Sequence, residues 1–101
     1  MGWSTSHDTA YRSADSVSEV GRHVANVLSA RDWRAVHKLF KLANRADGPF
    51  TISSRDAGRM AAALGKAAGH SLMPVAWRGE VSALADAAQC AATARQPWEW
   101  S

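Results

Sequence analysis

Apolar side chains recur at helical intervals in four stretches of the chain. In residues 29–45 they are spaced by one, three or four positions, which places them on one side of an α-helix. The apolar residues of this stretch are Trp33, Val36, Leu39, Phe40 and Ala43. Similar patterns predict a first helix from about Val17 to Leu28, a third after Ser53 and a fourth from Pro74 to about Ala94.

Capping residues mark where the first two helices begin. Ser16 and Glu19 have the spacing of a capping box, in which the two side chains satisfy free backbone N–H groups. Ser29 or Asp32 is expected to cap the second helix. Because the joint between these helices is very short, we expect them to be antiparallel or sharply angled neighbours.

The third and fourth helices are bounded by serine, glycine and proline. Ser53 is expected to be the N-cap of the third helix, with Asp56 supporting the helix dipole. Gly69 is expected to end that helix in a left-handed conformation. Pro74 suits the first turn of the fourth helix, and Pro97 stops it.

Three short segments have extended character. In residues 3–7 larger side chains alternate with serines, residues 50–52 have strand composition, and the alternation in residues 98–100 places two indoles on one side. The predicted fold class is therefore mainly α. We expect a single small helical domain over residues 1–101, with about four helices around one core and at most a minor short β pairing.

The predicted core gathers the apolar sides of the four helices and one strand residue. It consists of Val20, Val24, Val27, Trp33, Val36, Phe40, Ile52, Met60, Leu64, Trp77, Val81 and Leu84.

The composition is typical of a small cytosolic protein. A chain of 101 residues allows one domain, and a single cysteine excludes an intrachain disulfide. No apolar run approaches the ~20 residues of a membrane span, so we expect a cytoplasmic protein without a membrane partner. The formal net charge is +3, and the location of this charge matters more than its total.

Cations recur on the opposite side of the second helix from its apolar residues. Five of them follow intervals of three and four, and Asp32 is the only anion among them. At ~100° per residue this stripe lies opposite the apolar side. Three further cations form a shorter stripe on the third helix. Together the two stripes comprise Arg31, Arg34, Lys38, Lys41, Arg45, Arg55, Arg59 and Lys66.

The stripe on the second helix has three explanations. The commonest is a solvated helix face, usually with both signs interleaved. Here neighbouring cations repel one another, and Arg31 lies near the positive end of the helix dipole, so local stability does not explain them. The second explanation is weak, sequence-independent binding of a nucleic-acid backbone or another polyanion. The third is a protein interface.

A helix-turn-helix over residues 53–81 is disfavoured. The joint between its helices is longer than the usual three or four residues. The following helix is acidic at Glu80 and Asp86, whereas a recognition helix would be basic.

The tail tryptophans leave two alternatives open. Trp98 and Trp100 more commonly would fold back over an open end of the core. Otherwise they are interaction candidates, either as an anchor for a partner protein or as a platform on which bases stack. This second alternative would make the protein an interaction module.

No catalytic or metal-binding constellation is evident in the sequence. Neither His23 nor His37 has a His or Cys partner one helical turn further on. Cys90 lies among alanines and is expected to be a small buried hydrophobe. A glycine-rich phosphate loop and the HExxH and GxSxG signatures are absent. We therefore expect a non-enzymatic protein with no cofactor and no metal.

Several distinctive segments are distributed over nearly the whole chain. They are Met1-Gly2-Trp3, Asp32-Trp33-Arg34, Phe50-Thr51-Ile52, Gly69-His70-Ser71-Leu72-Met73-Pro74 and Ala94-Arg95-Gln96-Pro97-Trp98-Glu99-Trp100-Ser101. In these segments, above all in Pro-Trp-x-Trp-Ser, the chain resembles a group of small uncharacterised proteins of Streptomyces-type actinobacteria and their phages and plasmids. The resemblance implies a cytosolic bacterial protein related to mobile elements. Under the alternative function of an interaction module, such a protein would act on host machinery. The resemblance implies no activity, because the group has none assigned.

Overall fold

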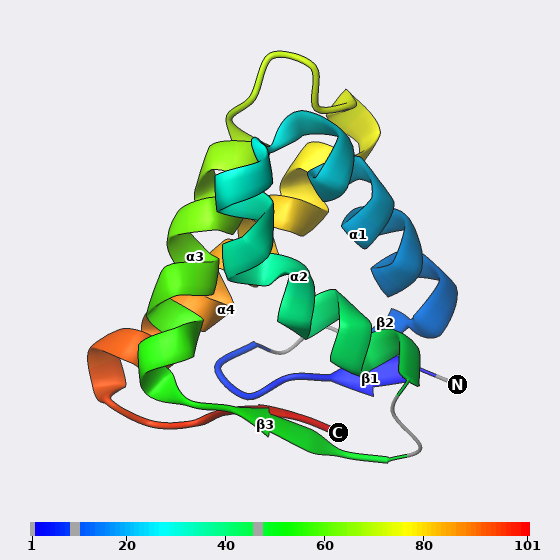
Figure 1. The fold of residues 1–101 in the computed structure, drawn as a ribbon. Helices are drawn as coiled ribbons and strands as arrows, with labels where there is room; N and C mark the ends of the chain where they lie inside the picture. Colours follow the sequence, from blue (N-terminus) through cyan, green and yellow to red (C-terminus); the bar gives the residue numbers. More distant parts are fainter. Residues whose placement is uncertain (1, 9–10, 46–47) are drawn as a thin grey trace.

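The computed structural model describes residues 2–8, 11–45 and 48–101, and these contain four helices and four short strands (Figure 1). The helices are α1 (Ala14–Val27), α2 (Ala30–Arg45), α3 (Ser54–Ala68) and α4 (Val75–Ala94). The strands are β1 (Gly2–Ser4), β2 (Tyr11–Ser13), β3 (Phe50–Ile52) and β4 (Trp98–Trp100). The predicted fold class, mainly α with a minor β pairing, is confirmed.

The helices stand on a floor of strands (Figure 1). β1 pairs antiparallel with β2, and β3 pairs antiparallel with β4, so that Phe50 lies opposite Trp100 and Ile52 opposite Trp98. A bridge between Thr5 and Trp100 connects the two pairs. Segments from the start, middle and end of the chain therefore form one surface beneath the helices.

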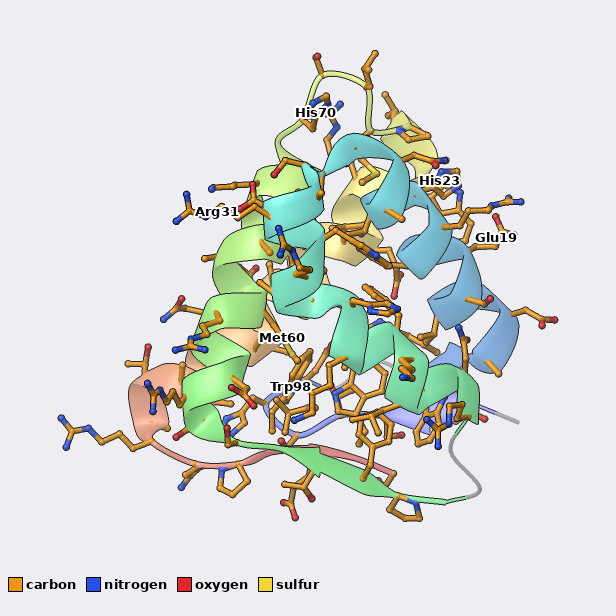
Figure 2. The ribbon with its side chains drawn as sticks, in the orientation of Figure 1. Glu19, His23, Arg31, Met60, His70 and Trp98 are labelled. Carbon is orange, nitrogen blue, oxygen red and sulfur yellow. The ribbon has the colours of Figure 1, made fainter. Side chains whose placement is uncertain are left out.

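One core fills the space between the helices and this floor. Trp98 and Trp100 are fully buried, and Figure 2 shows Trp98 beneath the helices, below Met60 of α3. The ring of Trp100 contacts those of Trp98 and Trp3 edge to face, with centroids 5.2 and 6.0 Å apart. Because side chains alternate along a strand, both indoles of β4 enter the core while Glu99 between them is exposed.

The predicted core is largely confirmed. All of its members are buried except Val27, Trp33 and Trp77, which are partly buried and pack against it. The prediction omitted Trp3 and the two tail tryptophans, which come from the strands. These residues reach the core only through strand pairing, which the helical periodicity does not reveal.

The capping box predicted for the first helix is wrong. α1 begins at Ala14, and its N-cap is Ser13, whose Oγ accepts a hydrogen bond from the backbone N–H of Ser16 at 3.1 Å. The chain enters the helix directly from the end of β2. The first helical turn, residues 14–16, contains no large apolar side chain, so the hydrophobic pattern begins one turn later than the helix.

The serine caps of the next two helices agree with the sequence prediction. The Oγ atoms of Ser29 and Ser53 each accept a backbone N–H three residues further on, at 3.2 Å. α1 and α2 are therefore joined by a very short connection, and they pack against each other as expected.

The expected left-handed conformation is found at the end of a different helix. Gly69 has φ −86° and ψ −3°, because its N–H continues the helical pattern with a bond to the carbonyl of Gly65 at 3.1 Å. Arg95, with φ 56°, instead closes α4 after Ala94, where the sequence predicts its end. Pro74 is the N-cap of α4 and not a residue of its first turn.

Candidate functional site

All eight side chains of the two cationic stripes are exposed. The stripe on α2 lies opposite buried residues such as Val36 and Leu39, as the helical spacing predicts. Figure 2 shows Arg31 projecting outward from α2. Because α2 packs against α3, the structure brings the two stripes together on one face of the molecule.

Two ion pairs cross between the helices of this cationic face. Lys38 of α2 lies 3.5 Å from Asp56 of α3, and Lys66 of α3 lies 3.4 Å from Asp32 of α2. Both lysine side chains are more than 60% exposed, so these contacts contribute little and exchange readily for another anion. Within the described residues, the other cations of the two stripes make no ion pair.

An open groove of about 420 Å³ runs between α1 and α2, beside the stripe on α2. Trp33 and Phe40 form an aromatic wall, with ring centroids 6.0 Å apart and planes 10° from parallel. His37 is exposed, and its ring centroid lies 5.3 Å from that of Trp33. Lys41 and Arg45 line the groove as well, so they belong both to the groove and to the cationic face.

Small residues on α1 explain why the groove exists. Ser18, Gly21 and Ala25, which recur at intervals of three and four, form its other side. Gly21 lets the helices approach closely, because a Cβ at this position would lie 2.9 Å from Cδ1 of Phe40. Because these small side chains do not cover it, Trp33 is only partly buried, whereas the sequence predicts it as a core residue.

The tail tryptophans do not form an accessible platform. Trp98 and Trp100 have no exposed surface, so the folded-back arrangement is confirmed and the accessible one is wrong. The reason is the pairing of β4 with β3, which turns both indoles toward the core. The aromatic residue that lies beside the cations is Trp33, which the sequence predicts as a core residue.

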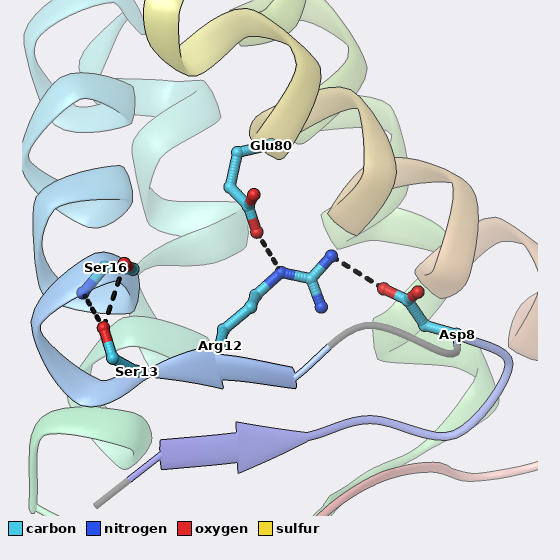
Figure 3. A network of polar contacts seen from close by, with 5 residues as sticks. All are labelled: Asp8, Arg12, Ser13, Ser16 and Glu80. Atoms are coloured by element: carbon cyan, nitrogen blue, oxygen red, sulfur yellow. Dashed lines mark hydrogen bonds and ion pairs between the residues drawn. The ribbon is translucent and has the colours of Figure 1, made fainter.

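A buried ionic cluster around Arg12 was not predicted from the sequence (Figure 3). The side chain of Arg12 is 2% exposed and lies between two carboxylates, with Nη2 at 2.7 Å from Oδ2 of Asp8 and Nε bonded to Glu80 of α4. The cluster therefore ties β2 to α4. Nothing in Tyr11-Arg12-Ser13 signals burial, because only strand pairing decides which of these side chains turns inward. None of its members lines the groove.

Cys90 is exposed, so the prediction of a small buried hydrophobe is wrong. In this part of α4 the inward positions are taken by alanines such as Ala87 and Ala91. Cys90 lies between them on the outer side, since the helical turn points it away from the core.

The histidines are held by separate neighbours. His23 packs on Trp77 with ring centroids 5.5 Å apart and lies 3.7 Å from Glu19. Nδ1 of His70 accepts the backbone N–H of Leu72 at 3.1 Å. In the part of the chain that the structure describes, no three His, Cys, Asp or Glu side chains converge to form a metal site.

Comparison with known proteins places the chain in a family. A family model described as "Domain of unknown function (DUF7739)" matches residues 4–101. The chain belongs to this family. All four helices, the cationic face and the groove lie within the matched residues, and the family description names no activity. The coarser part of the resemblance, to small uncharacterised proteins, is therefore confirmed.

The remaining comparisons add no relative. No curated protein and no solved structure is significantly similar to the chain. None of the helices in the described residues combines the length and the hydropathy needed to cross a membrane.

Proposed function

We propose that the protein binds the backbone of a nucleic acid, or another polyanion, through the cationic face of α2 and α3. The supporting observation is that both stripes are exposed and adjacent, with only two lysines held by carboxylates among the described residues. Lysine and arginine side chains in such an array displace the counterions condensed on phosphates. Contacts of this kind do not read bases, so binding is sequence-independent.

The cations of this face fall into two groups. Arg31, Arg34, Lys41 and Arg45 make no ion pair within the described residues, and they contact phosphates first. Lys38, at 3.5 Å from Asp56, exchanges its carboxylate for a phosphate at little cost because the pair is exposed. The cations of α3 extend the surface.

The alternative function, a protein-interaction module, depended on an accessible tryptophan tail. Because the structure buries Trp98 and Trp100, that alternative loses its main support. We further propose that the protein is non-enzymatic and cytoplasmic. We also propose that it is of actinobacterial origin and related to mobile elements.

The salt dependence of affinity tests this proposal. If about five phosphates are contacted on duplex DNA, log affinity falls against log salt with a slope near −4 to −5. Fluorescence anisotropy of a labelled duplex between about 50 and 200 mM salt measures this slope. Replacing Arg34, Lys38 and Lys41 together by glutamine flattens it by about three, roughly one for each lost contact. Glutamine is a good helix former, so α2 stays folded.

A matched pair of single variants separates this face from general charge effects. Lys41→Gln and Arg95→Gln remove the same charge, but Arg95 lies at the end of α4 and outside both stripes. Lys41→Gln reduces the slope by about one, and Arg95→Gln leaves it unchanged. Equal effects of the two variants, or no binding of the wild type at low salt, would contradict the proposal.

A further inference from the structure

The groove between α1 and α2 combines two features of proteins that bind single-stranded nucleic acid, an aromatic wall and a cationic rim. Its wall is the partly buried ring of Trp33, stacked on Phe40 and flanked by the exposed His37. Its rim carries Lys41 and Arg45, which also belong to the cationic face. Proteins that bind single strands join a cationic track for the phosphates to aromatic rings on which bases stack.

The dimensions and the charges of the groove fit one aromatic ring beside phosphates. Its volume of about 420 Å³ is within the range of about 300–1,000 Å³ that small-molecule pockets occupy. Arg22 on the α1 side is held by Glu19 at 2.5 Å, whereas Lys41 and Arg45 make no ion pair within the described residues. Free positive charge is therefore concentrated on the α2 side of the groove, beside Trp33.

We propose that this groove receives one unpaired base of single-stranded nucleic acid, stacked against Trp33, while Lys41 and Arg45 hold the adjoining phosphates. This inference rests on the proposed function and specifies its substrate. In a duplex the bases are stacked on one another and do not enter the groove, so a duplex uses the cationic face alone. A single strand gains the stacking contact in addition.

The decisive comparison uses two labelled strands with the same number of phosphates, oligothymidine and its abasic counterpart. Stacking of one base is worth about 1–3 kcal/mol, which is about 5- to 140-fold in affinity. Anisotropy titrations at about 50 mM salt are expected to show oligothymidine binding tighter than the abasic strand by such a factor. Equal affinities with an intact salt slope would overturn the base-stacking inference and leave the backbone proposal standing, and no binding of either strand would overturn both.

Variants of the groove locate the preference. Trp33→Leu is expected to bind both strands with the affinity that the wild type has for the abasic strand. Trp33→Phe is expected to keep most of the preference for oligothymidine. Ala25→Leu provides an independent route, because Ala25 is exposed on α1 and lines the groove, and the change leaves the cations of α2 in place. A leucine there fills the groove, and leucine is nearly as good a helix former as alanine. A preference that survives Ala25→Leu in full would overturn the inference, even if Trp33→Leu failed to fold.

A free nucleotide is the other source of the same chemistry, a base beside a phosphate. Thymidine monophosphate offers only one phosphate, so it is expected to displace oligothymidine only at concentrations far above the dissociation constant of the oligonucleotide. Displacement at equal concentration would assign the groove to a mononucleotide and overturn the single-strand inference.

Discussion

Two aromatic clusters in this molecule differ in what lies opposite them. In the strand floor, Trp100 is covered by Trp3, Phe50 and Trp98, which come from three different strands, and it has no exposed surface. In the groove, Trp33 has small α1 residues opposite it and is partly buried. The burial of an aromatic ring here depends less on its own segment than on the size of the residues that another segment brings.

Trp100→Ala should produce the largest loss of stability. Removing this fully buried indole leaves a cavity between β4, β1 and β3, and we expect a cost of about 3–5 kcal/mol. Trp33→Ala, at the open cluster, should cost about 1–2 kcal/mol, within the range of ordinary point mutations. Urea denaturation followed by far-UV circular dichroism measures both. If the two losses are equal, the groove is as closed as the floor and the comparison fails.

Breaking the ionic cluster beneath α4 should have an intermediate effect. Glu80→Gln removes one of the carboxylates beside the buried Arg12, and we expect a loss of about 1–3 kcal/mol for this charged hydrogen bond. Asp86→Asn is the matched control on the same helix, because Asp86 is exposed, and it should change stability by less than about 0.5 kcal/mol. If Glu80→Gln leaves the free energy of unfolding unchanged, Arg12 is held by Asp8 and the strand alone.

A pair of glycine substitutions tests the close approach behind the groove, and one of them, Gly65→Ala, has the smallest expected effect of these variants apart from the control Asp86→Asn. Gly65 on α3 is exposed with nothing within 4 Å of an added Cβ, so Gly65→Ala should stabilise the protein by about 0.5–1 kcal/mol. Gly21→Ala has the same helical gain but forces the ring of Phe40 to move, which costs about 1–3 kcal/mol. Of the two substitutions, only Gly65→Ala should therefore raise the melting temperature, which thermal denaturation measures. A rise for both would show that α1 and α2 have room to separate.

The helices could be predicted from the sequence because each carries its own periodic signal. The apolar side of α2, the cap at Ser53 and the end of α4 at Ala94 all depend on local patterns. The two cationic stripes were predictable for the same reason, since the members of each stripe share one side of one helix. The cross-helix pairs of Lys38 and Lys66 were not predictable, because they depend on how α2 and α3 pack.

The features that were not predicted from the sequence are formed where two segments of the chain come into contact. Burial of Arg12 depends on β1 on one side and α4 on the other, and no residue near it in sequence signals this. The residues that line the groove do follow a recognisable pattern in the sequence. The small residues of α1 at positions 18, 21 and 25 recur at helical intervals, as do Trp33, His37 and Lys41 on α2. Only the packing of the two helices shows that these rows face each other.

The strand that seals the core is synthesised after all four helices. β4 pairs with β3, and reciprocal backbone hydrogen bonds of 2.8 and 2.9 Å join Ser4 to Ser101 across the floor. During translation the four helices therefore leave the ribosome before the two indoles that close their apolar sides. Until residues 98–101 emerge, the nascent chain presents an open hydrophobic surface, so the core closes only after β4 has left the ribosome.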